Sequence, residues 1–145
     1  MKKLLIAALL TVTVATSAFA ADEKKVNGNI LNAFESEFAE ASKVQWSVKS
    51  EYIKASFEID GVKTDAFYNH KGESIGLSRK ITLEDLPVQA KRTFAKKYSD
   101  YTVKEAIKFE GNEETAFYVS AENEKHSIIL KITSAGVSVY KKTSK

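Results

Sequence analysis

The stretch YIKASFEIDGVKTDAFYNHKGESIGLSR, residues 52–79, decides the fold that this sequence predicts. Apolar and polar residues alternate along it in three runs, 52–59, 62–69 and 73–79, and such alternation predicts strands. Asp60-Gly61 separates the first two runs. A two-residue type I′ turn favours this pair, because both central positions need positive φ. Lys71-Gly72 follows before the third run, so we expect three consecutive strands joined by two short turns.

The turn at Asp60-Gly61 also fixes which residues face each other. It sets Ile59 opposite Val62, Phe57 opposite Thr64, Ala55 opposite Ala66 and Ile53 opposite Tyr68. We expect this apolar face to pack on a helix, together with Trp46, Ile75 and Leu77. On the other face Glu58 meets Lys63 as a cross-strand ion pair. That outer face would also carry Tyr52, Lys54, Ser56, Asp65, Phe67, Asn69 and Ser78.

A helix over about residues 29–41 and a strand over 44–48 precede this stretch. The apolar residues of the helix recur at three- and four-residue spacing, which places them on one face. They are Ile30, Leu31, Phe34, Phe38 and Ala41. Asn29 is a suitable N-cap. Glu35, Glu37 and Glu40 would form a solvated acidic face.

The second half of the chain repeats this order. Pro87 fits the first turn of a helix that ends near residue 98, because proline needs no amide donor there. The helix would bury Leu86, Ala90, Phe94 and Tyr98 and expose Lys91, Arg92, Lys96 and Lys97. Strands are expected near 101–109, 115–121, 125–132 and 137–142. Asn123-Glu124 corresponds to the turn at Asp60-Gly61, and Ala135-Gly136 corresponds to the turn at Lys71-Gly72. Both pairs are separated by 63 or 64 residues, which indicates a duplicated unit.

With Asn123-Glu124 as a two-residue loop, the strands of the second half also acquire two distinct faces. The face toward the helix would hold Phe117, Val119, Ile128, Leu130 and Ile132, joined by Val103, Ile107, Phe109, Val137 and Val139. The outer face would hold Tyr118, Ser120, Ser127, Ile129, Lys131 and Tyr140, with Lys104 and Lys108 nearby.

The first residues predict export rather than fold. Two lysines, an apolar run and Ala18-Phe19-Ala20 form a secretory signal peptide, residues 1–20, cleaved after Ala20. We expect a periplasmic or secreted protein that is not an integral membrane protein after cleavage. Residues 21–145 would be one domain of two repeats, about 29–81 and 82–142. There is no cysteine, so no disulfide or thiol chemistry is expected.

The composition argues against several classes of function. The chain has 22 basic and 19 acidic residues, and two of the basic ones, Lys2 and Lys3, belong to the signal peptide. The mature chain therefore has 20 basic and 19 acidic residues and a formal net charge of +1. Nucleic-acid binding needs a concentrated basic face, which this balance does not supply. His70 and His126 lie in different halves without metal-ligand spacing, and His70 suits a turn position with unusual φ. No nucleophile or phosphate-loop motif is present, so we expect neither an enzyme, a metal site nor a cofactor.

The outer face of the sheet is the candidate partner-binding surface. It interleaves aromatic and lysine side chains, and aromatic side chains on a rigid surface give large contact area at low entropic cost. The candidate residues are Tyr52, Lys54, Phe67, Tyr118, Ile129 and Tyr140. The residues leave a second interpretation open, in which these are ordinary cross-strand pairs covered by the alkyl stems of lysines.

Several short motifs occur along the mature chain: Phe34-x-x-x-Phe38, Val44-x-Trp46, Asp60-Gly61, Asp65-Ala66-Phe67-Tyr68, Leu86-Pro87 and Lys97-Tyr98. Together they resemble the motifs of the PepSY-like, or β-lactamase-inhibitor-like, periplasmic proteins of Bacteroidetes. The resemblance implies an α+β fold: two helix-plus-four-strand repeats form an antiparallel sheet, with the helices on one face and the other face open. It also implies a non-enzymatic module that docks a protein or peptide through that face. A small-ligand carrier or sensor in the envelope remains the alternative, and the oligomeric state is not predicted.

Overall fold

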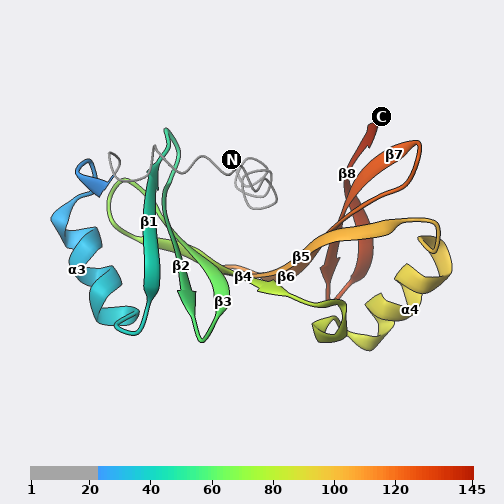
Figure 1. The fold of residues 1–145 in the computed structure, drawn as a ribbon, viewed down its shortest axis with the longest axis horizontal. Helices are drawn as coiled ribbons and strands as arrows, with labels where there is room; N and C mark the ends of the chain where they lie inside the picture. The colour runs from blue at the N-terminus through green and yellow to red at the C-terminus, as the bar shows by residue number, and fades with distance from the viewer. Residues whose placement is uncertain (1–22) are drawn as a thin grey trace. The chain divides into compact units, whose positions relative to one another are not determined.

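The structure is a computed structural model that describes residues 23–145, so the predicted signal peptide lies outside the described residues. A helix followed by four strands occurs twice (Figure 1). The first set is α3 (Gly28–Glu37), β1 (Ser42–Val48), β2 (Ile53–Ile59), β3 (Val62–Tyr68) and β4 (Ser74–Ile81). After a short 3-10 helix (Leu83–Asp85), the second set is α4 (Val88–Lys97), β5 (Thr102–Gly111), β6 (Thr115–Glu122), β7 (His126–Thr133) and β8 (Gly136–Ser144).

The eight strands belong to one sheet in chain order, which confirms the predicted α+β class. The strand pairs within each set are antiparallel. The chain divides into two compact units, Met1–Arg79 and Lys80–Lys145. We call them the first unit and the second unit and describe each by itself.

The predicted hairpin at Asp60-Gly61 is confirmed. Both residues have positive φ, 52° and 75°. The register between β2 and β3 is the predicted one at every pair, from Ile59 opposite Val62 to Ile53 opposite Tyr68. Glu58 lies opposite Lys63 as expected, but its carboxylate forms an ion pair with Lys43, at 3.1 Å between Nζ and Oε2.

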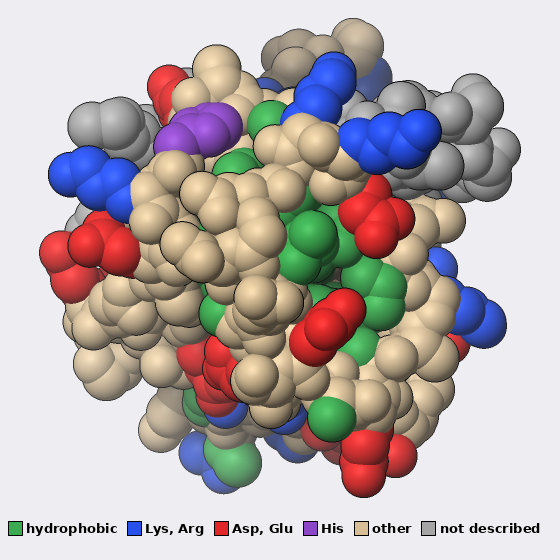
Figure 2. Space-filling view, turned by 90° about the vertical axis from the view of Figure 1, so that its left-hand side faces the viewer, with side chains coloured by type: hydrophobic (Ala, Val, Ile, Leu, Met, Phe, Trp, Pro, Cys, Tyr) green, Lys and Arg blue, Asp and Glu red, His purple; other side chains and the backbone are tan. Residues whose placement is uncertain are grey.

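Helix α3 begins earlier and ends earlier than predicted. Asn27, not Asn29, is the N-cap: its backbone is extended, and its side-chain oxygen accepts the backbone N–H of Asn29 at 2.9 Å. This bond satisfies one of the free amides of the first turn. The helix ends at Glu37, where the N–H of Phe38 donates to the carbonyl of Phe34. Acidic side chains stand on the side of the first unit that carries this helix (Figure 2).

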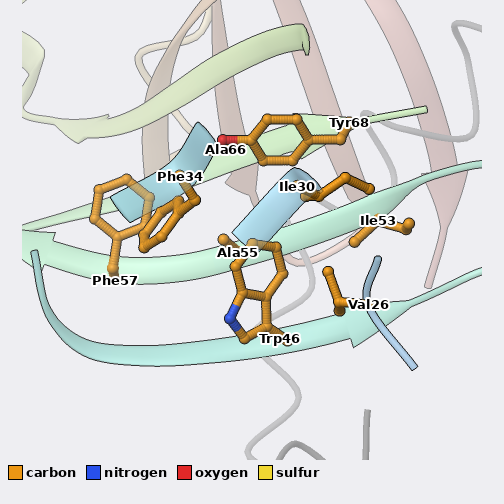
Figure 3. Packing of buried hydrophobic residues seen from close by; sticks show 9 residues of the cluster. All are labelled: Val26, Ile30, Phe34, Trp46, Ile53, Ala55, Phe57, Ala66 and Tyr68. Atoms are coloured by element: carbon orange, nitrogen blue, oxygen red, sulfur yellow. The ribbon is translucent and has the colours of Figure 1, made fainter. Parts of the chain in front are cut away.

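The core of the first unit is built largely from aromatic rings. Phe34 contacts Trp46 and Phe57 edge to face, with ring centroids 5.2 and 5.0 Å apart. Figure 3 shows these rings between α3 and the sheet, with Ala55 and Ala66 leaving the space that they fill. All five predicted helix residues and Leu77 belong to this core. Ile75 was predicted there too, but it is the extra residue where the register between β3 and β4 shifts.

Helix α4 confirms its predicted buried face. Pro87 occupies the N-cap rather than the first turn. Leu86, Ala90, Phe94 and Tyr98 pack into an otherwise mostly aliphatic core of the second unit. That core includes Phe117, Val119, Ile128, Leu130 and Ile132, the face predicted for β6 and β7. Val139 was predicted there but is 49% exposed, because β8 ends the sheet and has a neighbour on one side only.

The turn between β6 and β7 is centred one residue later than predicted. Phe117 lies opposite Ile132 and Glu122 opposite Ser127, so the two central residues are Glu124 and Lys125. Asn123 comes directly before them and stabilises the turn: its side-chain oxygen accepts the backbone N–H groups of both Lys125 and His126, at 3.0 and 2.8 Å. The shift changes each pairing by two residues, so every side chain keeps its predicted face.

A bulge in β5 reverses part of the predicted face assignment. Val103 lies opposite Ala121, but Glu105 already lies opposite Ser120, so Lys104 is an extra residue. One extra residue moves every later side chain to the other face. Ile107 and Phe109 therefore share the outer face with Tyr118, not the core as predicted. Ala106 takes their place in the core. Lys108 lies opposite Phe117, so it belongs to the helix side and not to the outer face.

Candidate functional site

Tyr118 is the centre of the outer face of the second unit. Its ring is buried, at 2% exposure, and the ring of Tyr140 meets it edge to face at 5.7 Å. Lys131 lies directly opposite it on β7 and donates a hydrogen bond from its ammonium group to the carboxylate of Glu114. Because the aromatic side chains are packed and the lysine is paired, this surface is ordered before any partner binds.

The two phenols of this cluster stay neutral and the ammonium group of Lys131 stays charged at neutral pH, because all three pKa values are raised. Burial raises the pKa of Tyr118, and the nearby charge of Lys131 partly offsets that effect. Burial also raises the pKa of Tyr140. The hydrogen bond to Glu114 raises the pKa of Lys131. The cluster therefore presents neutral phenols beside a fixed cation, which suits binding rather than proton transfer.

Half-buried apolar side chains surround Tyr118. Ile129 is half-buried opposite Lys141, and Phe109 is half-buried on β5. The Phe109 ring leans over Gly111, where a Cβ would come within 2.8 Å of it, so glycine leaves room for the ring. The hydroxyl of Tyr140 is buried and has no hydrogen-bond partner within residues 23–145. We define the second-unit patch as Phe109, Tyr118, Ile129, Lys131 and Tyr140.

The outer face of the first unit carries a smaller aromatic pair. Tyr52 and Phe67 meet edge to face at 5.6 Å, and both are buried, at 7% and 0% exposure. Lys54 lies between Ser47 and Phe67 in the register and is half-buried. Burial raises the pKa of Tyr52, and the negative charges of Asp65 and Glu51 add to the effect.

The expectation that the candidate aromatic side chains are exposed is wrong for Tyr52, Phe67 and Tyr118. Each is packed against a neighbouring ring, and Tyr118 also lies opposite Lys131. Lys54, Ile129 and Tyr140 keep part of their surface exposed. Whether any of the six residues binds a partner stays a prediction.

Sequence reasoning missed Phe109 and Glu114 in this cluster. An alternating pattern gives no sign of a bulge, so Phe109 was assigned to the wrong face. Glu114 lies between β5 and β6, outside the strands that the sequence predicts, and only the fold shows that it reaches Lys131, seventeen residues away. The charge pattern alone cannot predict a pairing over that separation.

Three further features of residues 23–145 concern metal ligands, the role of His70 and membrane-spanning helices. No three His, Cys, Asp or Glu side chains in this range gather as metal ligands would. His70 was expected at unusual φ, but the non-glycine residues of positive φ in this range are Lys43 and Asp60. Instead, Nε2 of His70 lies 2.8 Å from the carbonyl oxygen of Lys49 and ties two turns together. No helix in this range is long and apolar enough to cross a membrane.

Solved structures with the same fold come from Bacteroides species. A DUF2874 family protein from Bacteroides uniformis aligns with a TM-score of 0.73 and 16% identity, over 82% of this chain and 89% of its own. A protein from Bacteroides eggerthii, described as periplasmic, gives 0.73 and 18%, over 82% and 88%. A BLIP-like protein from Bacteroides fragilis gives 0.67 and 18%, over 85% and 91%.

These comparisons confirm the sequence resemblance to β-lactamase-inhibitor-like periplasmic proteins at the level of the fold. No family model matches the sequence, and no curated protein matches it.

Proposed function

We propose that this protein is a non-enzymatic binding module of the bacterial envelope that docks a protein or peptide on the second-unit patch. It would be exported by the signal peptide, cleaved after Ala20, and act in the periplasm as one domain of residues 21–145. The similar fold of a BLIP-like protein and of a protein described as periplasmic supports this proposal.

The observation that carries the proposal is the composition of the second-unit patch. Ile129, Tyr140 and Phe109 keep part of their apolar surface exposed around the buried ring of Tyr118. Lys131 is held in place by Glu114. Partly exposed aromatic and apolar side chains, supported from below by a buried ring, can supply the contact surface of a binding hot spot. Since the rings are already packed, binding would lose little side-chain entropy.

Crosslinked affinity capture from an envelope extract tests the proposal. The baits are the mature chain and an Ile129→Ser, Tyr140→Ser double variant, which spares the buried Tyr118. Val88→Ser is the matched control. Val88 is 59% exposed on α4, so this variant also replaces an exposed apolar side chain by serine, but outside the second-unit patch. Circular dichroism checks that all three baits are folded.

We expect a defined protein to be captured by the mature chain and by Val88→Ser but lost by the double variant. A protein that all three baits capture equally would contradict the second-unit patch as the docking surface. Capture of no protein above background by the mature chain would contradict the binding-module function itself.

A further inference from the structure

A groove lies on the first unit, between α3 and the edge strand β1. Its volume is about 410 Å³, within the range typical of small-molecule pockets. Phe34 and Trp46 form its buried base, while Leu31, Phe38 and Val44 leave apolar surface accessible along its sides. Figure 2 shows this side of the molecule, with hydrophobic side chains visible in a hollow and acidic side chains beside it.

The position of Glu35 follows from helical spacing. Leu31 and Glu35 are four residues apart in α3, so they lie on one ridge along the border of its buried face, and Ala39 lines the groove from beyond the end of the helix. That ridge faces the groove, and Glu23 adds a second carboxylate to the lining. Within residues 23–145, the groove is lined by no basic side chain. The groove therefore combines apolar walls and aromatic rings with negative charge only.

Apolar walls and aromatic rings beside two carboxylates favour a positively charged ligand over a neutral or negatively charged one. An apolar molecule would gain from the walls but leave the carboxylates unused, and an anion would be repelled by Glu35 and Glu23. A cation can pair with a carboxylate and also lie over an aromatic ring. We propose that the groove binds a small organic cation, an ammonium group on an apolar stem. The proposal is independent of the second-unit patch, which lies on the other unit.

Trp46 gives a direct measurement, because it is the single tryptophan of the chain and lines the groove. The probes are hexylammonium chloride, sodium hexanoate and hexan-1-ol at pH 7, titrated into the mature chain while its fluorescence is recorded. N-acetyltryptophanamide is titrated alongside to correct for collisional quenching. We expect saturable binding of hexylammonium with a Kd on the order of 1 mM. Hexanoate should give no saturable change, and hexanol should bind more weakly than hexylammonium.

Two variants separate the charge of the groove from the charge of the helix. Glu35→Gln should weaken hexylammonium binding about twofold to fivefold, the range expected for one exposed ion pair. Glu37→Gln is the matched control, since it removes the same charge from the same helix outside the groove lining. It should leave the Kd unchanged. Raising the salt concentration should weaken binding to the mature chain more than to Glu35→Gln.

Equal binding of hexylammonium and hexanoate would overturn the proposal, and so would equal Kd values for Glu35→Gln and the mature chain. No saturable change with any probe would overturn it as well. A lysine-rich peptide that shifts Trp46 fluorescence where hexylammonium does not would make the groove a peptide-docking site instead. None of these results affects capture of a protein by the second-unit patch.

Discussion

The two units share one plan but fill it with different side chains. In both, a helix ends where an aromatic residue donates its N–H to the carbonyl of a phenylalanine four residues earlier: Phe38 to Phe34, and Tyr98 to Phe94. Phe34 is 4% exposed at the centre of an aromatic cluster, whereas Phe94 is half-buried at the margin of a mostly aliphatic core. The same topology is therefore compatible with either packing, because the helix and the sheet set only the volume to be filled.

The cores differ in that the first unit has more aromatic rings, but on the outer faces the second unit has the larger aromatic cluster. The first unit keeps small side chains around its Tyr52–Phe67 pair, with Ser47 and Ser78 buried beside it. The second unit builds a larger cluster around Tyr118. The first strand of each unit contains one extra residue, between Ser42 and Gln45 in β1 and at Lys104 in β5, so both units have this bulge. The difference lies in the residues that follow it: β5 places Ile107 and Phe109 on the outer face, whereas β1 places Ser47 there. Duplicated units can therefore acquire different binding surfaces through different side chains, without a change of fold.

The largest expected effect tests the difference between the cores. Phe34→Ala should lower the free energy of unfolding by about 3–5 kcal/mol, because it removes a buried ring and leaves a cavity among Trp46, Phe57 and Phe38. Phe94→Ala should lower it by no more than about 2 kcal/mol, since a half-buried ring loses less and the site can relax. Urea unfolding followed by far-UV circular dichroism measures both. Equal losses would show that the two cores are equivalent despite their composition.

The next effect is the loss of stability at alkaline pH, to which a buried tyrosine of each unit contributes differently. Burial raises the pKa of Tyr68 to about 12, and the charge of Glu37 adds to the effect. An unfolded tyrosine ionises near pH 10, so the folded state holds this proton more tightly. The stabilisation is fully present below pH 10 and is lost as pH rises toward 12. Between pH 9 and pH 11, the mature chain should lose about 1 kcal/mol more stability than Tyr68→Phe.

Tyr118→Phe is the comparison in the second unit. It should reduce the alkaline loss less than Tyr68→Phe does, because the charge of Lys131 opposes the rise in the pKa of Tyr118. Urea unfolding at the two pH values measures each variant. A greater reduction by Tyr118→Phe than by Tyr68→Phe would contradict this ranking of the two sites.

The smallest effect concerns two turns that each contain an asparagine. Asn69, after β3, accepts the N–H groups of Lys71 and Glu73 and donates to the Glu73 carboxylate at 2.6 Å. Asn123, after β6, accepts two backbone N–H groups in the same way but donates to Asp100, 23 residues away, at 2.7 Å. Asn69→Ala should cost about 1 kcal/mol in unfolding free energy, and Asn123→Ala somewhat more, because it removes a link between two distant segments and not only a bond within one turn. Asn69→Ser, which keeps an accepting oxygen without placing a second carboxylate beside Glu73, should cost less than Asn69→Ala. A larger loss for Asn69→Ala than for Asn123→Ala would contradict the role of Asp100.

Local patterns were enough to predict most of the fold. The Asp60-Gly61 turn determined the register of β2 and β3 at every pair, because only a few backbone conformations close a two-residue hairpin. Helical spacing identified the buried faces of α3 and α4, since the period of 3.6 is a property of the backbone. Even the displaced turn at Glu124 left the faces of β6 and β7 as predicted, because a shift of two residues preserves the alternation.

The candidate sites were decided by contacts between distant residues. The sequence by itself determined the two repeats, their strand order and their buried helix faces, because turn chemistry and residue periodicity act locally. Only the tertiary structure decided that Lys104 is an extra residue, that Tyr118 is buried beneath Tyr140, and that α3 and β1 leave a groove lined by Glu35. Each of these depends on how side chains far apart in the sequence share one volume, and periodicity carries no information about that.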